Sequence, residues 1–166
     1  MVSFHVVDEA VIAGTPHEIA DAFEDESSGR SSWFMPALKM RSRDGRRFDE
    51  SGAIADHWVY REGRDDRPLA HFVTRVTGSA PGRVERAHID GCFRGREVWT
   101  FEPVDEGHTK IILDWQTRTH GILLGILARP MDLGGRHSRT IQKGFSAMEA
   151  HIAAARGSSQ PREPSS

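Results

Sequence analysis

Apolar and polar residues alternate along much of the chain between residues 37 and 119, and glycine, proline and aspartate separate the alternating runs. A period of two places every second side chain on the same face of a β-strand. A valine-rich stretch with partial alternation at the N-terminus fits the same pattern. We therefore expect an antiparallel sheet whose strands span residues 2–13, 37–43, 52–60, 69–78, 83–90, 94–102 and 109–119.

The segment after the first predicted strand has the signals of a helix start. Thr15, Pro16 and Glu18 stand in the order of an N-cap, a first helical residue and a capping-box partner. This order predicts a short helix over 16–25. A second short helical turn is expected before Pro36, because glycine and clustered serines interrupt anything longer.

A long amphipathic helix is predicted near the C-terminus, over residues 133–156. Its apolar residues recur at intervals of four, three and four, which places them on one helical face. That face can cover the sheet, so residues 1–156 are expected to form a single domain. Residues 157–166 have nothing to bury and are predicted to be a disordered tail. The four apolar residues are Ile141, Phe145, Met148 and Ile152.

Charge and cysteine content narrow the classes of partner. The chain has 22 lysines and arginines against 24 acidic residues, a formal net charge of -2, which gives no general reason to bind nucleic acid. The basic run at 41–47 is interrupted by Asp44 and lacks aromatic residues for base stacking. The only cysteine, Cys92, cannot form an internal disulfide, which favours a cytoplasmic location.

The least polar run of the chain, residues 120–131, is too short to cross a membrane. A spanning helix needs about 20 apolar residues, and this run is bounded by His120 and Arg129. We therefore expect no stable membrane insertion. Its apolar residues do not keep to one helical face, a pattern that needs another explanation.

The order of strand, two short helices, six strands and a long helix resembles the helix-grip fold of the SRPBCC superfamily. This superfamily includes START lipid-transfer domains, plant pathogenesis-related allergens and polyketide cyclase/dehydrase-like proteins. The similarity covers residues 2–155 and is carried by structural motifs rather than by a reaction signature. The matching features are VIAGTPHEIADAFED at 11–25, Trp33 with Pro36, Gly52, the segment 99–131 and HSRTIQKGFSAMEAHI at 137–152.

The resemblance implies an α+β fold in which a curved seven-stranded antiparallel sheet wraps around the C-terminal helix. It also implies a cavity between them for an apolar or aromatic small molecule. The run before the helix would then face both the core and the ligand, which accounts for its lack of a polar face. The residues of this run that would face the core and the ligand are Ile122, Leu123, Leu124, Ile126 and Leu127.

Large aromatic side chains are expected on the concave side of the sheet, if each strand turns the same face inward. The alternative is that they fill a solid core. The complete set predicted to line the ligand is Trp58, Tyr60, Trp99, Phe101, Leu113, Trp115, Leu123, Leu127, Ile141, Phe145 and Met148.

Two carboxylates stand in register with these aromatic residues. Glu97 precedes Trp99 by two positions and Asp56 precedes Trp58 by two. Inside a cavity, desolvation would raise the pKa of both carboxyl groups and suit them to act as catalytic acids or bases. Arg75 on a neighbouring strand could neutralise one of them. The alternative is that both are solvated at the ends of their strands.

Other chemistry has weak support in the sequence. The nine histidines occur in no zinc-binding spacing, so we expect no metal and no cofactor. His88 and Asp90 share a strand face and could form an oriented base, although a histidine near a strand end is usually a surface residue. No serine or cysteine lies in a nucleophile-elbow sequence.

These observations leave three functions open. The first is binding of a hydrophobic small molecule, such as a lipid, polyketide or aromatic metabolite, by a monomer or homodimer. The second is a polyketide cyclase/dehydrase-like enzyme that uses the carboxylates of Glu97 and Asp56. The third is a non-enzymatic protein-interaction domain of the co-chaperone-activator type.

Overall fold

The structure, a computed structural model, describes residues 2–61, 64–120 and 132–158. All seven predicted strands are present, in one antiparallel sheet of order β1-β7-β6-β5-β4-β3-β2. The elements are β1 (Ser3–Ile12), α1 (Pro16–Ser28), β2 (Leu38–Ser42), β3 (Ile54–Arg61), β4 (Arg64–Ala80), β5 (Arg83–Gly91), β6 (Phe93–Pro103), β7 (Thr109–Thr119) and α3 (Leu133–Ser158).

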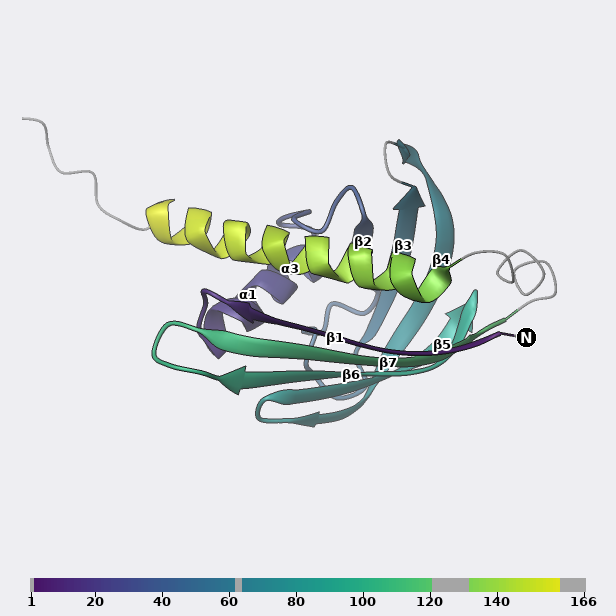
Figure 1. Cartoon of the computed structure of the whole chain (residues 1–166), viewed down its shortest axis with the longest axis horizontal. Coiled ribbons are helices and arrows are strands. Elements are labelled where there is room, and N and C mark those ends of the chain that lie inside the picture. The colour runs from purple at the N-terminus through teal and green to yellow at the C-terminus, as the bar shows by residue number, and fades with distance from the viewer. Residues whose placement is uncertain (1, 62–63, 121–131, 159–166) are drawn as a thin grey trace, which may run out of the picture.

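The sheet is curved, and α3 lies against its concave side. Figure 1 shows β1, β7 and β6 passing along one side of α3, while β2, β3 and β4 rise past it. Side chains from both elements form one core. The expected helix-grip architecture is therefore confirmed.

Helix α1 starts as predicted. The Thr15 side chain accepts a hydrogen bond from the backbone N–H of Glu18, and the Glu18 carboxylate accepts one from the backbone N–H of Thr15. The helix continues to Ser28, three residues further than expected, and ends at Gly29, whose φ of 83° is in the left-handed region that favours glycine.

The second short helix expected before Pro36 is instead a turn. The backbone N–H of Leu38 donates to the carbonyl of Phe34 at 3.2 Å, which closes one turn around residues 33–37. Strand β2 begins directly after it, so no further helical residue can follow.

Helix α3 buries the predicted apolar face, with Ile141, Phe145, Met148 and Ile152 all in the core. Residues 157 and 158, which were assigned to the tail, are its last two residues. The remainder of the predicted tail and the apolar run at 121–131 lie outside the described residues. No helix within the described ranges is long and apolar enough to cross a membrane.

The C-terminal end of α3 is hydrogen-bonded to the start of α1. The Arg156 guanidinium donates two hydrogen bonds of 2.6 Å to the Glu18 carboxylate. The hydrogen bonding from Arg156 is the largest of the effects that lower the pKa of Glu18 to about 2. Further along the same interface, His151 lies 3.0 Å from a carboxylate oxygen of Asp25.

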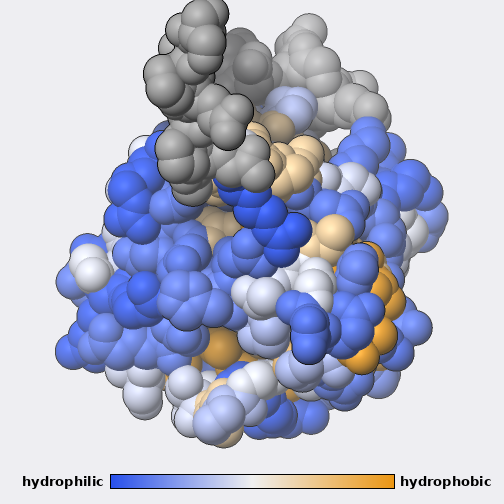
Figure 2. All heavy atoms as spheres, turned by 90° about the vertical axis from the view of Figure 1, so that its left-hand side faces the viewer, coloured by the Kyte–Doolittle hydropathy of each residue, from blue (hydrophilic) through white to orange (hydrophobic). Residues whose placement is uncertain are grey.

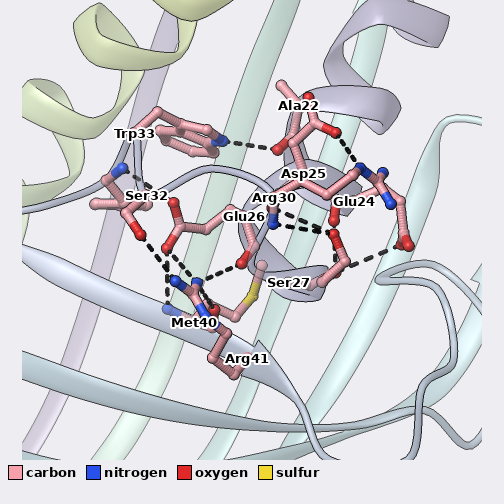
Figure 3. A network of polar contacts seen from close by, with 12 residues as sticks. Ala22, Glu24, Asp25, Glu26, Ser27, Arg30, Ser32, Trp33, Met40 and Arg41 are labelled. Atoms are coloured by element: carbon pink, nitrogen blue, oxygen red, sulfur yellow. Dashed lines mark hydrogen bonds and ion pairs between the residues drawn. The ribbon is translucent and has the colours of Figure 1, made fainter.

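A buried carboxylate organises the chain between α1 and β2. Glu26 is fully buried and accepts hydrogen bonds of 3.3 Å from the backbone N–H groups of Phe34 and Met40. Arg41 donates to the same carboxylate at 3.1 Å, and Figure 3 shows Met40 and Arg41 beside Glu26. Burial raises the pKa of Glu26, while the donors and the arginine oppose that effect. Glu26 thus fixes both the turn and the first part of β2.

The arginines of the basic run at 41–47 all contact carboxylates within the protein. Their nitrogen to oxygen distances lie within the range of an ion pair. The partners are Glu26 for Arg41, Asp56 for Arg43, Asp44 and Glu50 for Arg46, and Asp49 for Arg47.

We predict that Glu26→Ala lowers the free energy of unfolding by about 3 kcal/mol, because it leaves two backbone donors and Arg41 without their acceptor. Urea unfolding followed by circular dichroism measures this change. The control is Asp21→Ala, an exposed carboxylate on the same helix, for which we expect a change within about 0.5 kcal/mol. Equal effects of the two substitutions would contradict the role given to Glu26.

Candidate functional site

Strand β6 carries the side chains that meet α3. Glu97 and Trp99 are buried on this strand, and Trp99 contacts Phe145 of α3. Because side chains alternate along a strand, Phe93 and Phe101 share the face of Glu97 and Trp99. These four side chains form a row along the interior between the sheet and the helix.

One end of this interior is filled by aromatic side chains. Phe23 of α1 stacks on Phe48 with ring centroids 4.1 Å apart and meets Trp99 edge-on at 5.2 Å. Trp99 meets Phe145 edge-on at 6.5 Å. At the α1 end, the sheet and α3 therefore pack directly against each other.

A surface pocket of about 370 Å³ lies outside this aromatic cluster, between α1 and the turn that joins β4 to β5. Phe23, Phe48 and Phe101 contribute to its wall. Figure 2 views the molecule from the left-hand side of Figure 1 and shows a mostly hydrophilic surface with apolar side chains exposed in separate places. The pocket is thus separated from the interior by the stacked rings of Phe23 and Phe48.

A charged cluster lies in the interior beside the aromatic end. Arg86 of β5 is 1% exposed, and its Nε lies 3.8 Å from Oε1 of Glu97. His88 of β5 is 3% exposed, and its Nε2 lies 3.4 Å from Oε2 of Glu97. The guanidinium of Arg86 also packs on Phe48, with its carbon 4.6 Å from the ring centre. A positive charge and a negative charge are thus buried together among rings.

His57 of β3 adjoins this cluster. Its Nε2 lies 2.9 Å from the hydroxyl of Thr74, and both residues are buried. Burial, followed by the nearby charge of Arg86, lowers the pKa of His57 to about 3. His57 is therefore neutral at physiological pH and can accept or donate a hydrogen bond without adding charge.

Glu97 is ionised in this environment. Burial acts to raise the pKa of its carboxyl group, but His88 and Arg86 outweigh it and lower that pKa to about 2. The expected net rise in the pKa of Glu97 is therefore wrong, because the sequence did not reveal the neighbouring guanidinium and imidazole groups whose effect exceeds that of desolvation. Glu97 can orient His88 and balance Arg86, but it has no proton to give near neutral pH.

Several nitrogen atoms of the cluster have no hydrogen-bond acceptor. Nε of Arg86 and both ring nitrogens of His88 are buried without a partner of hydrogen-bond geometry among the residues that the structure describes. An unsatisfied buried polar group costs about 1–3 kcal/mol. Native structures contain few such groups, and those they contain call for an explanation such as an unseen ligand or water.

A wall of aromatic rings extends from the cluster toward the N-terminal part of α3. His57 stacks on Phe72 at 4.6 Å, and Phe72 meets Phe93 edge-on at 5.6 Å. Phe93 in turn meets Trp115 edge-on at 5.4 Å, and Trp115 stacks on His137 of α3 at 4.0 Å. The charged cluster thus lies at the edge of an extended aromatic surface.

Asp56 and Trp58 lie on the opposite face of the sheet from Glu97. Asp56 pairs with Arg43 at 2.6 Å and with His71 at 2.8 Å. The hydrogen bond from Arg43 is the main reason why the pKa of Asp56 is lowered. The expectation that Asp56 projects into the interior with Glu97 is therefore wrong, because β3 turns Ala55 and His57 inward instead.

Trp58 packs on this outer face against His71 at 5.4 Å, with Lys39 over its ring at 5.7 Å. Tyr60 is half-buried beyond a shift in the pairing register of β3 and β4. Arg75 is exposed, so the arginine near Glu97 is Arg86 rather than Arg75.

Two further residues predicted to line a ligand, Leu123 and Leu127, lie outside the described residues. The remaining ones are in the core or packed against it. The core members of the predicted set are Trp99, Leu113, Trp115, Ile141, Phe145 and Met148, with Phe101 packed against them.

Sequence reasoning missed Arg86 and His57, and it favoured a surface position for His88. The available signal was that Arg86 and His88 alternate in β5 with Glu85 and Ala87, on the same face as Val84. Asp90 does not share the environment of His88, since its side chain is 71% exposed and lies near Arg94. A register shift in the pairing of β4 and β5 separates the two.

The histidines and carboxylates of the cluster do not form a metal centre. Across residues 2–61, 64–120 and 132–158, no group of three or more histidine, cysteine, aspartate or glutamate side chains could hold a metal ion. The arginine in the cluster also disfavours a cation there. The arrangement instead offers hydrogen-bond donors beside aromatic rings.

No model of a known protein family matches the sequence, and neither does any curated protein. Solved structures do match. The Zhui aromatase/cyclase from Streptomyces sp. R1128 aligns over 96% of this chain and 100% of its own, with a TM-score of 0.72 and 13% identity.

Two further structures show the same architecture. A START superfamily protein from Mycobacterium smegmatis aligns over 91% of this chain and 98% of its own, with a TM-score of 0.65 and 16% identity. The ginseng major latex-like protein 151 from Panax ginseng aligns over 92% and 99%, with a TM-score of 0.65 and 8% identity. At such identities the similarity establishes the fold, and function has to be argued from the site.

We predict that His57 makes stability depend on pH. Because its folded-state pKa is about 3, the unfolded chain binds a proton below pH 6.5 that the folded chain does not. Stability is therefore lost as the pH falls from 6.5, by up to about 1.4 kcal/mol per pH unit. In His57→Asn this contribution disappears, and urea unfolding between pH 7 and pH 5 should show a shallower slope.

The matched control is His17→Asn. The side chain of His17 is 85% exposed, so this substitution should leave the slope unchanged. An unaltered slope in His57→Asn would show that His57 accepts a proton in the folded protein.

Proposed function

Because the chain has the helix-grip fold of the SRPBCC superfamily, we propose that it binds a hydrophobic small molecule between the concave face of its sheet and α3. A lipid, a polyketide or an aromatic metabolite would suit the aromatic wall. The observation that carries the proposal is the buried cluster of Arg86, His88 and Glu97, in which Nε of Arg86 and both ring nitrogens of His88 have no hydrogen-bond partner among the described residues.

The energetics of this cluster favour a ligand over a purely structural role. A buried ion pair recovers its desolvation cost only with good geometry and further hydrogen bonds. The separation of 3.8 Å between Arg86 and Glu97 is too long for a hydrogen bond. Apolar residues of similar volume would stabilise the core at least as well. A ligand acceptor would satisfy the nitrogens.

The chemistry of the unsatisfied groups defines the ligand further. Arg86 has only donors, so its partner must be an oxygen or another acceptor. The aromatic wall supplies flat apolar contact for the remainder of the molecule. The ligand that fits is therefore an apolar or aromatic compound that carries a carbonyl-type oxygen.

A reaction in the same site is the second function that we propose. Two structures with this fold are those of an aromatase/cyclase and of a norcoclaurine synthase in complex with dopamine and hydroxybenzaldehyde. In this chain His88 would exchange a proton with the substrate, and the Glu97 carboxylate, 3.4 Å from Nε2, would stabilise the imidazolium. Arg86 would stabilise negative charge that develops on a carbonyl oxygen of the substrate.

We predict that the protein binds 2-acetylnaphthalene more tightly than 2-ethylnaphthalene, because only the ketone has an acceptor for Arg86. Arg86→Met should weaken binding of the ketone about 10-fold or more, since a hydrogen bond to a charged group contributes about 1.5–3 kcal/mol. Binding of 2-ethylnaphthalene should change little. Isothermal titration calorimetry measures both affinities.

Arg96→Met serves as the control, because Arg96 lies on the same sheet but is exposed and contacts Gln116. This variant should keep the preference of the native protein. If the native protein binds neither compound, or if Arg86→Met retains the preference for the ketone, the proposed site is wrong.

For the enzymatic function we predict that Glu97→Gln and His88→Phe abolish cyclisation of a poly-β-carbonyl thioester while the affinity for 2-acetylnaphthalene falls much less. Product analysis by mass spectrometry measures the turnover. Normal turnover in both variants would exclude the proton-transfer role of this pair.

A further inference from the structure

A second carboxylate and imidazole pair lies at the other end of the aromatic wall. Asp8 of β1 is 5% exposed, and its Oδ2 lies 3.3 Å from Nδ1 of His137. His137 belongs to the first part of α3 and stacks on Trp115 with an interplanar angle of 10°. The pair thus joins the edge strand, the helix and the aromatic wall at one point.

The charge state of Asp8 follows from this placement. Burial acts to raise the pKa of its carboxyl group, but contacts with His137, Ser138 and Gln142 outweigh burial and lower that pKa. Asp8 is therefore an anion near neutral pH. A buried anion beside Nδ1 favours the tautomer with hydrogen on Nδ1 and leaves the lone pair on Nε2.

The other nitrogen of His137, Nε2, has no hydrogen-bond partner among the described residues. Nδ1 is buried, so the 17% of the side chain that is exposed lies elsewhere on it. The two nitrogens of an imidazole point in widely different directions, so Nε2 points away from Asp8 and from the edge strand β1. The Asp8 carboxylate lies 3.3 Å from Nδ1 without hydrogen-bond geometry, so it acts on the imidazole through its charge and leaves Nε2 to accept a proton.

His137 is not isolated from the proposed ligand site. Trp115, on which it stacks, also meets His88 edge-on at 6.5 Å. Both imidazoles therefore contact the same tryptophan, His137 on the ring face and His88 at an edge.

We propose that Asp8 and His137 form a second polar subsite, at which Nε2 of His137 accepts the proton of an acidic hydroxyl group on the ligand. This inference rests on the proposed function and extends it, because it identifies the ligand class as phenols or enols. In the transfer the O–H bond of the ligand breaks and the oxygen keeps the electron pair as a phenolate or enolate. Nε2 takes the proton, and the resulting imidazolium is stabilised by the Asp8 carboxylate.

The test uses 2-naphthol, which becomes a strong acid when it absorbs light and emits as naphtholate only if a nearby group accepts its proton. With the protein in excess, bound 2-naphthol should emit mainly as naphtholate. His137→Phe keeps a ring to stack on Trp115 but removes the base, so most of the naphtholate emission should be lost. Asp8→Asn should reduce the naphtholate emission to a lesser extent.

The matched control is His151→Phe. His151 also lies on α3 and pairs with a carboxylate, Asp25, but it faces α1. This variant should emit like the native protein. Binding affinity of 2-naphthol should fall about 10-fold or less in His137→Phe, as expected for the loss of one hydrogen bond.

The outcomes separate this inference from the proposed function. If 2-naphthol and 2-ethylnaphthalene both bind but the bound naphthol emits in its neutral form, or if His137→Phe emits like the native protein, only the subsite is overturned. If neither compound binds, the proposed function and the subsite both fail. Naphtholate emission that depends on His137 and not on His151 supports the subsite.

Discussion

The arginine buried inside the curved sheet is the constraint on which the site depends. A guanidinium that is 1% exposed cannot be left without a counter-charge, and Glu97 on the next strand provides it. His88 lies 3.4 Å from the same carboxylate, and burial together with the charge of Arg86 keeps His57 neutral. A polar group of defined composition therefore persists in an interior that is otherwise made of rings and aliphatic side chains.

The two ends of the interior serve different purposes. At the α1 end, Phe23, Phe48 and Trp99 close the space between the sheet and α3 and stabilise the fold. Toward the N-terminal part of α3, rings alternate with imidazoles, and several of their nitrogens lack acceptors. The proposed ligand site therefore lies where hydrogen bonding among the described residues is incomplete.

The architecture could be predicted from the sequence because alternation, capping and helical periodicity all agreed. The positions of all seven strands, the capping box at Thr15 and the buried face of α3 follow from local pattern. The second short helix was not predictable in this way, since the contacts of Glu26 with the backbone of Phe34 and Met40 determine that turn. Such contacts connect residues that are separated in the sequence, so a local sequence pattern does not predict them.

The site was only partly predictable, because strand pattern does not decide which face points inward. On β3 the large side chains of Asp56 and Trp58 suggested one face, yet Ala55 and His57 occupy the interior. On β5 the charged Arg86 is buried, while the apolar Ile89 is exposed. Glu97 was placed correctly beside Trp99, but its ionisation depends on partners from another strand.

The most direct test of the account follows the guanidinium of Arg86 itself. In a spectrum that correlates each arginine Nε with its proton, the resonance of Arg86 is assigned from the loss of one signal in Arg86→Met. We predict that 2-acetylnaphthalene shifts this resonance strongly, while 2-ethylnaphthalene shifts it little. If the ketone binds and the Arg86 resonance stays in place while resonances around the surface pocket at Phe101 move, the ligand does not bind in the interior and Arg86 does not recognise it.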